Sequence, residues 1–117
     1  KPEKIFYSWG FYSSHSTGFF IRLRSAKKVG NYNTKYKYHA DYDYFYRMIV
    51  KRKFIGISTK KNEIVGIFRR GGFSSTIPYR KLFYEEMKIR YDNGQNIFLL
   101  LFIALYKIVK HFRKIIK

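Results

Sequence analysis

Two carboxylates placed two residues apart are the strongest candidates for chemistry in this sequence. Asp41 and Asp43 stand where an amphipathic helix is predicted to begin, and Arg47 follows Asp43 by four residues. Side chains four residues apart are neighbours on a helix surface, so Asp43 and Arg47 are expected to pair. Asp41 then stays at the helix tip, where a carboxylate can serve as the general base for an acceptor hydroxyl.

The same residues also fit a purely structural explanation. An Asp at the start of a helix commonly caps it by accepting free backbone N–H groups. Asp43 would then complement the positive end of the helix dipole, and Arg47 would form an ordinary salt bridge. Local chemistry favours capping, so a catalytic role for Asp41 needs support from elsewhere in the sequence.

A basic segment that contains two glycines is the second candidate. Paired arginines, backbone N–H groups and hydroxyls can together hold a diphosphate. The spacing is not that of a P-loop, and an exposed turn between a strand and a helix explains the same residues. The residues of this segment that we assign to substrate binding are Arg69, Arg70, Gly71, Gly72 and Ser74.

His15 is the third candidate, because it stands among hydroxyl-bearing residues just before a β-prone run. Its ring can hydrogen-bond an acceptor sugar or a phosphate, although neighbouring backbone groups can satisfy it equally well. The chain has three histidines, seven acidic residues and no cysteine, and we assign no metal ligands in it.

The composition narrows the classes of function. The 117 residues are the usual size of one domain, and the lack of cysteine excludes disulfides, cysteine-ligated metals and thiol catalysis. A net charge of +18 favours a polyanionic partner such as nucleic acid, an anionic membrane surface or a phosphate-bearing substrate. A coding bias towards Lys, Tyr, Ile, Asn and Phe explains the same charge without any partner.

Apolar periodicity predicts the helices that position these residues. Apolar side chains recur with helical spacing after Asp41, so a helix is expected from there to the basic run at 51–53. A single helical turn is expected over 26–29, closed by Gly30, and a second long helix over 79–91.

Alternating side chains predict strands between and before these helices. Residues 54–58 and 63–68 are expected to form a hairpin or two successive strands, and 17–23 a shorter strand. Residues 31–37 lack an apolar period and are expected to form a loop. Strands and helices together indicate an α/β fold class.

The last segment of the chain has a different character. Residues 97–106 are apolar without interruption, a run too short for a membrane span, which needs about 20 apolar residues. The segment is therefore either a buried core helix or an amphipathic helix lying on an anionic bilayer, and both alternatives stay open. If the rest of the segment is helical, its lysines share one face, namely Lys107, Lys110, Lys114 and Lys117. Its apolar residues share the other face, namely Ile108, Phe112 and Ile115.

Four segments, in order and at compatible spacing, resemble family 2 glycosyltransferases, in particular the second half of the bacterial polysaccharide-assembly members. They lie within about residues 13–76 and are His15-Ser16-Thr17-x-Phe19-Phe20-Ile21-Arg22, Val29-Gly30-x-Tyr32-Asn33, 40–47 and 68–75. The resemblance implies a partial GT-A fold, which is the α/β fold of nucleotide-diphospho-sugar transferases. Residues 1–93 would be its acceptor-side half, and 94–117 a basic amphipathic tail helix.

The resemblance also implies an inverting sugar transfer and roles for the candidate residues. Asp41 falls at the general-base position and would deprotonate the acceptor hydroxyl, with Asp43 and Arg47 in support. His15 falls in the cleft for donor and acceptor, and segment 69–75 falls near the donor diphosphate.

Other parts of the family pattern are not found in this sequence, whose one Asp-x-Asp, Asp41-Tyr42-Asp43, is assigned to the base motif. The first nucleotide-binding units and the Asp-x-Asp metal motif belong to an N-terminal half, so we expect Mg²⁺ or Mn²⁺ to be bound mainly there. Residues 1–117 alone are expected to be inactive. The expected partners are a nucleotide-sugar donor, a saccharide or lipid-linked acceptor and, through 95–117, an anionic membrane surface at the inner, cytoplasmic face.

The rival from another class is a nucleic-acid-binding module without catalysis, suggested by the charge and the interleaved aromatic residues. No helix-turn-helix, RNA-binding or zinc-finger signature supports it, and the basic residues are spread over the whole chain. We therefore expect no nucleic-acid partner. A non-catalytic protein that binds membranes through its tail is a further alternative, but it leaves the four segments unexplained.

Overall fold

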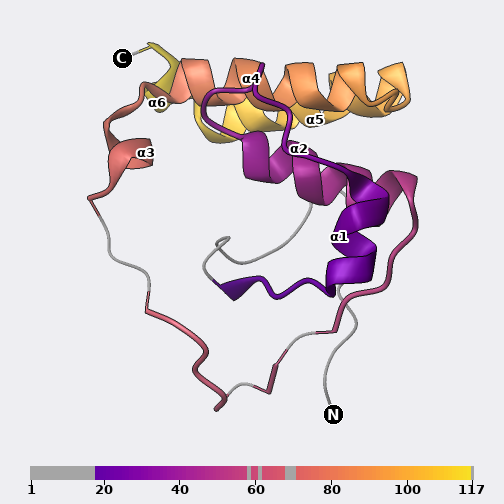
Figure 1. Ribbon diagram of the computed structural model, residues 1–117. Helices are drawn as coiled ribbons and strands as arrows, with labels where there is room; N and C mark the ends of the chain where they lie inside the picture. Colours follow the sequence, from indigo (N-terminus) through magenta and orange to yellow (C-terminus); the bar gives the residue numbers. More distant parts are fainter. Residues whose placement is uncertain (1–17, 58, 61, 68–70, 117) are drawn as a thin grey trace.

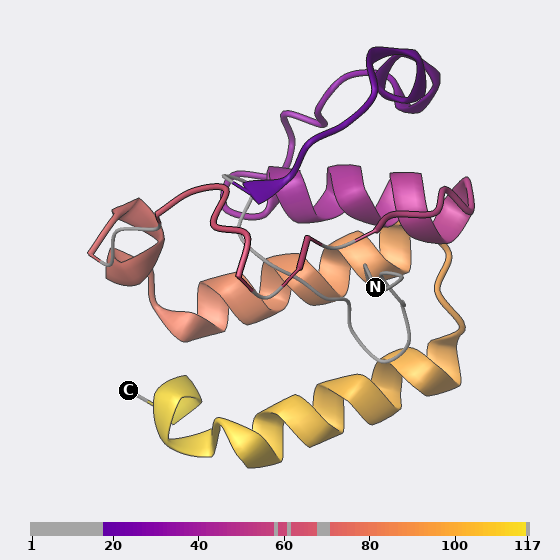
Figure 2. The same ribbon diagram turned by 90° about the horizontal axis from the view of Figure 1, so that it is seen from below.

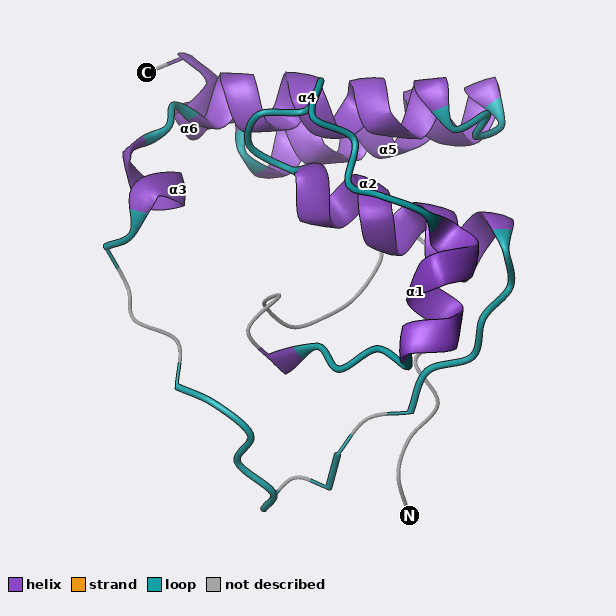
Figure 3. Ribbon diagram, in the orientation of Figure 1, coloured by secondary structure: helices purple, strands orange, loops and turns teal. Residues whose placement is uncertain are grey.

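The described part of the protein is built from helices. The computed structural model describes residues 18–57, 59–60, 62–67 and 71–116. In Figure 3 these residues form helices joined by loops. The elements are α1 (Leu23–Val29), α2 (Ala40–Tyr46), its π-helical continuation η2 (Arg47–Lys51), α3 (Phe73–Thr76), α4 (Tyr79–Asp92), α5 (Ile97–Lys110) and α6 (Phe112–Ile116).

The predicted α/β fold class, and with it the partial GT-A fold, is wrong for the described residues, which contain no sheet. The strands expected at 54–58 and 63–68 are not formed wherever they are described, and a single bridge residue, Ile57, is their one β-type position there. Phe54 packs against the main apolar cluster, but Ile55, Ile64 and Ile67 are uncovered, at 77%, 84% and 86% exposure. An isolated hairpin is marginal in water without further strands or a helix on its apolar face, and the described residues supply neither.

The predicted helices are confirmed. The helix expected from Asp41 is α2 with η2, and the second long helix is α4. The helical turn expected over 26–29 is the last part of α1, which ends at Gly30 with a φ of 87°. Because α1 begins at Leu23, the strand expected over 17–23 is wrong for its described part.

Helix α4 lies at the centre of the arrangement. Figure 2 shows α4 between α2 and α5, and Figure 1 shows α4 and α5 running along each other. The turn between α4 and α5 contains Gly94 with a φ of 77°, a conformation that glycine adopts without strain. Asn96 caps α5, because its side-chain oxygen accepts the N–H groups of Phe98 and Leu99.

The main apolar cluster joins α1 to α2 and η2. Helical spacing puts its α2 and η2 members towards the core, and Phe19 stacks on Phe45 with ring centroids 4.1 Å apart. Since α1 and α2 share this cluster, the loop between them is held at both ends. The cluster consists of Val29, Tyr44, Phe45, Met48 and Ile49.

Buried polar contacts join α4 to both of its neighbours. The Arg90 side chain is fully buried and donates to Glu86 and Gln95, with its guanidinium 5.5 Å from the ring centroid of Tyr42 on α2. Glu86 also accepts a hydrogen bond from Lys107 on α5. The ion pair of Arg90 with Glu86 therefore lies where α2, α4 and α5 meet.

The C-terminal segment is helical, as expected, but it breaks at His111 into α5 and α6. Lys107 turns towards α4 and contacts Glu86, so it does not share an exposed basic face with Lys110 and Lys114. Lys117 lies outside the described residues. Among the described helices, none has the length and apolar character needed to cross a membrane.

Candidate functional site

The expected base, Asp41, lies in the first turn of α2. It is the second residue of the helix, and its Oδ1 accepts the N–H of Tyr42 at 2.8 Å. The N-cap position belongs to His39, so the structural alternative in which Asp41 is the N-cap is wrong. Asp41 is partly exposed and lies at the end of α2 where the helix dipole is positive.

Asp43 holds the same turn from inside. It is 1% exposed, and its two oxygens accept hydrogen bonds from Arg47 Nε and Asn93 Nδ2, both at 2.9 Å. The predicted pairing of Asp43 with Arg47 is thus confirmed. Arg47 also donates to the carbonyl oxygens of Val29 at 3.0 Å and Asn31 at 2.8 Å. A buried carboxylate therefore ties α2 to the end of α4 and, through Arg47, to the loop after α1.

Glu85 of α4 holds the chain that leads into α2. It is 9% exposed, and its carboxylate accepts the N–H groups of three successive residues, Lys37, Tyr38 and His39. The His39 Nδ1 atom lies 3.9 Å from Glu85 Oε2. Hydrogen bonds to an ionised acceptor are stronger than neutral ones, so the start of α2 is firmly anchored to α4.

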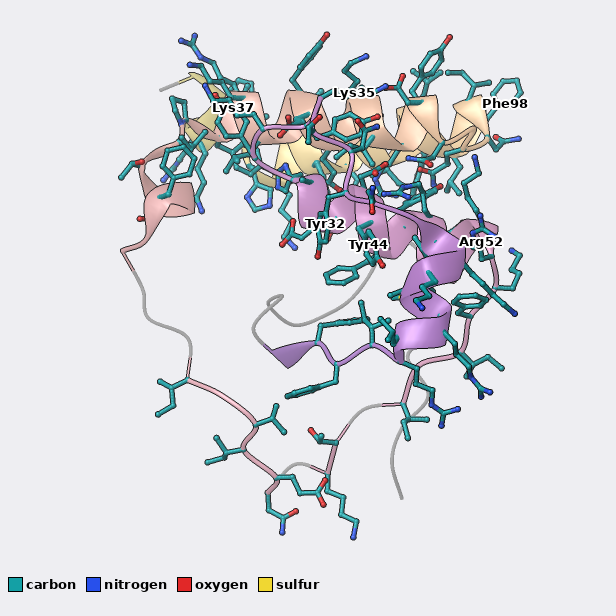
Figure 4. The ribbon with its side chains drawn as sticks, in the orientation of Figure 1. Tyr32, Lys35, Lys37, Tyr44, Arg52 and Phe98 are labelled. Carbon is teal, nitrogen blue, oxygen red and sulfur yellow. The ribbon has the colours of Figure 1, made fainter. Side chains whose placement is uncertain are left out.

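Tyr32 lies near Asp41 on the loop that Arg47 holds. Its ring stacks on that of Tyr44, with centroids 4.5 Å apart and planes 11° apart (Figure 4). Tyr32 is 50% exposed, whereas Tyr44 is buried. Partial burial and then the nearby charge of Asp41 raise the pKa of Tyr32 above its ordinary value, at which a tyrosine hydroxyl is already protonated at neutral pH. It can donate a hydrogen bond to a ligand next to the carboxylate.

Three of the predicted substrate-binding residues lie outside the described part of the chain. These are His15, Arg69 and Arg70. Their contacts with donor or acceptor stay predictions.

The glycines of the basic segment lead into α3. Gly71 has a φ of 91°, and Gly72 is the N-cap residue of α3, whose backbone includes Ser74. The Phe73 ring lies 6.4 Å from that of Tyr38, in the loop that enters α2. The structure therefore brings this part of the predicted diphosphate segment close to the start of α2.

Asp41 is the carboxylate of this region that can take a proton from a substrate. Asp43, Glu85 and Glu86 accept hydrogen bonds from Arg, Lys, Asn or successive backbone donors. Asp41 accepts the N–H of its own neighbour with one oxygen, which leaves lone pairs for a hydroxyl group.

A divalent metal ion does not fit this part of the chain. Within the described ranges there is no group of three or more His, Cys, Asp or Glu side chains placed to hold a metal. Mg²⁺ prefers oxygen ligands in octahedral geometry, and the buried carboxylates here are already used by cationic and N–H donors.

Glu85→Gln should lower the free energy of unfolding of the 117-residue chain by about 1.5–3 kcal/mol, the range for hydrogen bonds to charged groups. The amide keeps the size of the side chain but has one acceptor oxygen for three N–H donors. Urea unfolding followed by circular dichroism measures the change. The control is Glu63→Gln at an exposed position, expected to change stability by less than about 0.5 kcal/mol. Equal losses in both variants would refute the anchoring role of Glu85.

Sequence analysis missed Tyr32, Glu85 and Asn93. Glu85 and Asn93 lie 46–50 residues from the groups they bond, so no local spacing points to them. Tyr32 belongs to one of the segments that carry the resemblance, but its stacking on Tyr44 depends on the path of the loop.

Comparisons with known proteins add no family assignment. No protein-family model matches the sequence, and it has no match among curated proteins or solved structures.

Proposed function

We propose that this chain supplies the acceptor side of an inverting family 2 glycosyltransferase, with Asp41 as the general base. The observation that supports the proposal is that buried carboxylates fix the first turn of α2, on which Asp41 lies. Asp43 and Glu85 anchor that turn from inside, while the carboxylate of Asp41 stays partly exposed on it. Two segments of the resemblance also meet at the other end of α2, where Arg47 bonds the backbone of Val29.

The proposed reaction is a single displacement. Asp41 accepts the proton of the acceptor hydroxyl as that oxygen attacks the anomeric carbon of the donor sugar. The bond to the nucleoside diphosphate breaks on the opposite face and its electron pair leaves with the diphosphate, so the configuration inverts. The proton is then lost from Asp41 to water. We assign to Tyr32, whose ring stacks on Tyr44 in the loop that Arg47 holds, a hydrogen bond that orients the acceptor.

The remaining partners follow the resemblance. We assign the donor diphosphate to segment 69–75 and place His15 in the cleft. We place the ligands of the expected Mg²⁺ or Mn²⁺ ion outside the described residues. The acceptor is a saccharide or lipid-linked saccharide, and the enzyme is cytoplasmic, at the inner face of the membrane.

Donor turnover by the product of the complete reading frame tests this function. The resemblance implies a further half of about a hundred residues, with alternating strands and helices and an Asp-x-Asp pair. That product should release nucleoside diphosphate from a nucleotide sugar in a panel of UDP-, GDP- and dTDP-linked donors. Residues 1–117 alone should release none. An open frame that begins at Lys1, or a complete product inactive with every donor, would contradict the proposal.

A further inference from the structure

Helix α5 presents an apolar ridge on the side away from α4. Leu100 and Ile103 are buried, at 8% and 2% exposure, and mark the side that packs on α4. Figure 2 shows α5 at the outside of the helical layer, with α4 on one side of it. Residues spaced by three and four positions face the other way and form the ridge, which consists of Phe98, Leu101, Leu105 and Val109.

The ridge is exposed along its whole length. Its four side chains are 77%, 60%, 62% and 70% exposed in chain order, and Phe112 of α6 continues it at 57%. In Figure 4, Phe98 lies at the outer edge of the molecule, at the beginning of α5. A continuous apolar strip of this kind on a soluble domain marks an interaction surface.

Positive charge lies at the C-terminal end of the ridge. Residues 93–117 contain five Lys or Arg residues and no acidic residue. Lys107 is turned inward to Glu86, whereas Lys110, Arg113 and Lys114 are exposed. The acidic side chains of the neighbouring α4 are already paired, so they do not offset these charges.

We propose that this ridge inserts into the surface of an anionic lipid bilayer, with the exposed basic residues of α5 and α6 on the lipid headgroups. An apolar face with basic residues beside it is the pattern of a helix that lies in the membrane interface. A second copy of the chain would bring two sets of uncompensated positive charges together, so charge complementarity favours the lipid surface. The proposal deepens the membrane contact of the proposed function by naming the surface that makes it.

Lys107 lies on the inner side of α5, because it follows Leu100 by seven residues and Ile103 by four. It donates a hydrogen bond to Glu86 on α4. The outer side of α5 is therefore apolar from Phe98 to Val109. On this arrangement the bilayer lies on the side of α4 opposite to α2 and Asp41 (Figure 2).

Vesicle cosedimentation of the 117-residue chain tests the proposal. The ridge variant Phe98→Ser/Leu105→Ser/Val109→Ser should bind vesicles of phosphatidylcholine and phosphatidylglycerol at least about 30-fold more weakly, because three apolar side chains no longer leave water. A matched control changes three apolar residues elsewhere that are at least as exposed, Ile55→Ser/Ile64→Ser/Ile67→Ser, and should bind as the parent does.

A charge variant tests the role of the basic residues beside the ridge. Lys110→Gln/Arg113→Gln/Lys114→Gln should weaken binding to the anionic vesicles about fivefold for each charge removed, and leave weak binding to pure phosphatidylcholine unchanged. Equal losses on both kinds of vesicle would overturn the role assigned to these charges.

Two results would overturn the proposal as a whole. One is equal vesicle binding by the ridge variant and its control. The other is a parent chain that does not bind vesicles but forms a dimer, and a ridge variant that is monomeric. That result would assign the ridge to contact with a second copy of the chain.

If the circular dichroism spectrum shows that the ridge variant is unfolded, a second variant is used in its place, with Phe98→Trp in a chain that also carries Trp9→Phe. Its emission should shift to the blue and be quenched by brominated lipid, and an unchanged emission would count against insertion. Neither assay contains a sugar, so the outcome is independent of the glycosyltransferase proposal.

Discussion

Asp43→Asn should lower the free energy of unfolding of the 117-residue chain by about 3 kcal/mol, near the low end for breaking a buried ion pair. Asp43 is 1% exposed and accepts hydrogen bonds from Arg47 and Asn93. Asparagine keeps the shape but presents an NH₂ group to one of these donors and removes the charge that faces Arg47. Arg47 keeps the carbonyl oxygens of Val29 and Asn31 and is 22% exposed, which places the loss at the low end.

Asp92→Asn is the matched control for this variant. Counting side-chain atoms alone, Asp92 is 21% exposed and Asp43 is 2% exposed. The partners of Asp92 are Lys35, Tyr36 and Lys88. Exposed ion pairs contribute little, so we expect a loss below about 1 kcal/mol. Urea unfolding followed by circular dichroism compares the two. Equal losses would show that Asp43 holds α2 no more firmly than a surface carboxylate does.

The helices of this protein are predictable because their signals are local. The apolar spacing after Asp41 repeats every three or four residues, and both α2 and η2 follow it. Gly30 and Gly94 mark the ends of α1 and α4, where the structure has positive φ angles. Such patterns depend on a few neighbouring residues and therefore survive in a single sequence.

The strands were not predictable in the same way. The alternation in 54–58 and 63–68 indicates β-propensity, but a strand forms only when a partner pairs with it. In the described residues no such partner is present, and Ile64 and Ile67 remain exposed. The α/β fold inferred from the alternation and from the resemblance therefore fails, whereas the helical part of the prediction holds.

In the candidate site, too, local contacts were predictable from the sequence and contacts between helices were not. The bond between Asp43 and Arg47 follows from a spacing of four residues on one helix, and the structure contains it. The contacts from Glu85 and Asn93 cross from α4 to the region of α2, and only the packing of the two helices creates them. The exposed ridge of α5 also depends on packing, because Leu100 and Ile103 are buried on the side that faces α4 and the opposite side is left uncovered.

Asp41→Asn should lower the turnover number for sugar transfer by about 10²–10⁴-fold in the product of the complete reading frame, the usual contribution of a general base. Asparagine keeps an oxygen that can accept the N–H of Tyr42, so the first turn of α2 should be unchanged. The free energy of unfolding should therefore stay within about 0.5 kcal/mol of the parent value. The amide cannot accept the proton of an acceptor hydroxyl, and turnover alone should fall.

The direct test of the account is the rate of nucleoside diphosphate release coupled to acceptor glycosylation, measured for Asp41→Asn beside Glu63→Gln. Glu63 is an exposed carboxylate in the irregular segment after η2 and has no proposed role in transfer. The account predicts a large fall in the Asp41 variant at unchanged stability, and a rate close to that of the parent for the Glu63 variant. Parent-like transfer by the Asp41→Asn enzyme would contradict the assignment of Asp41 as the base.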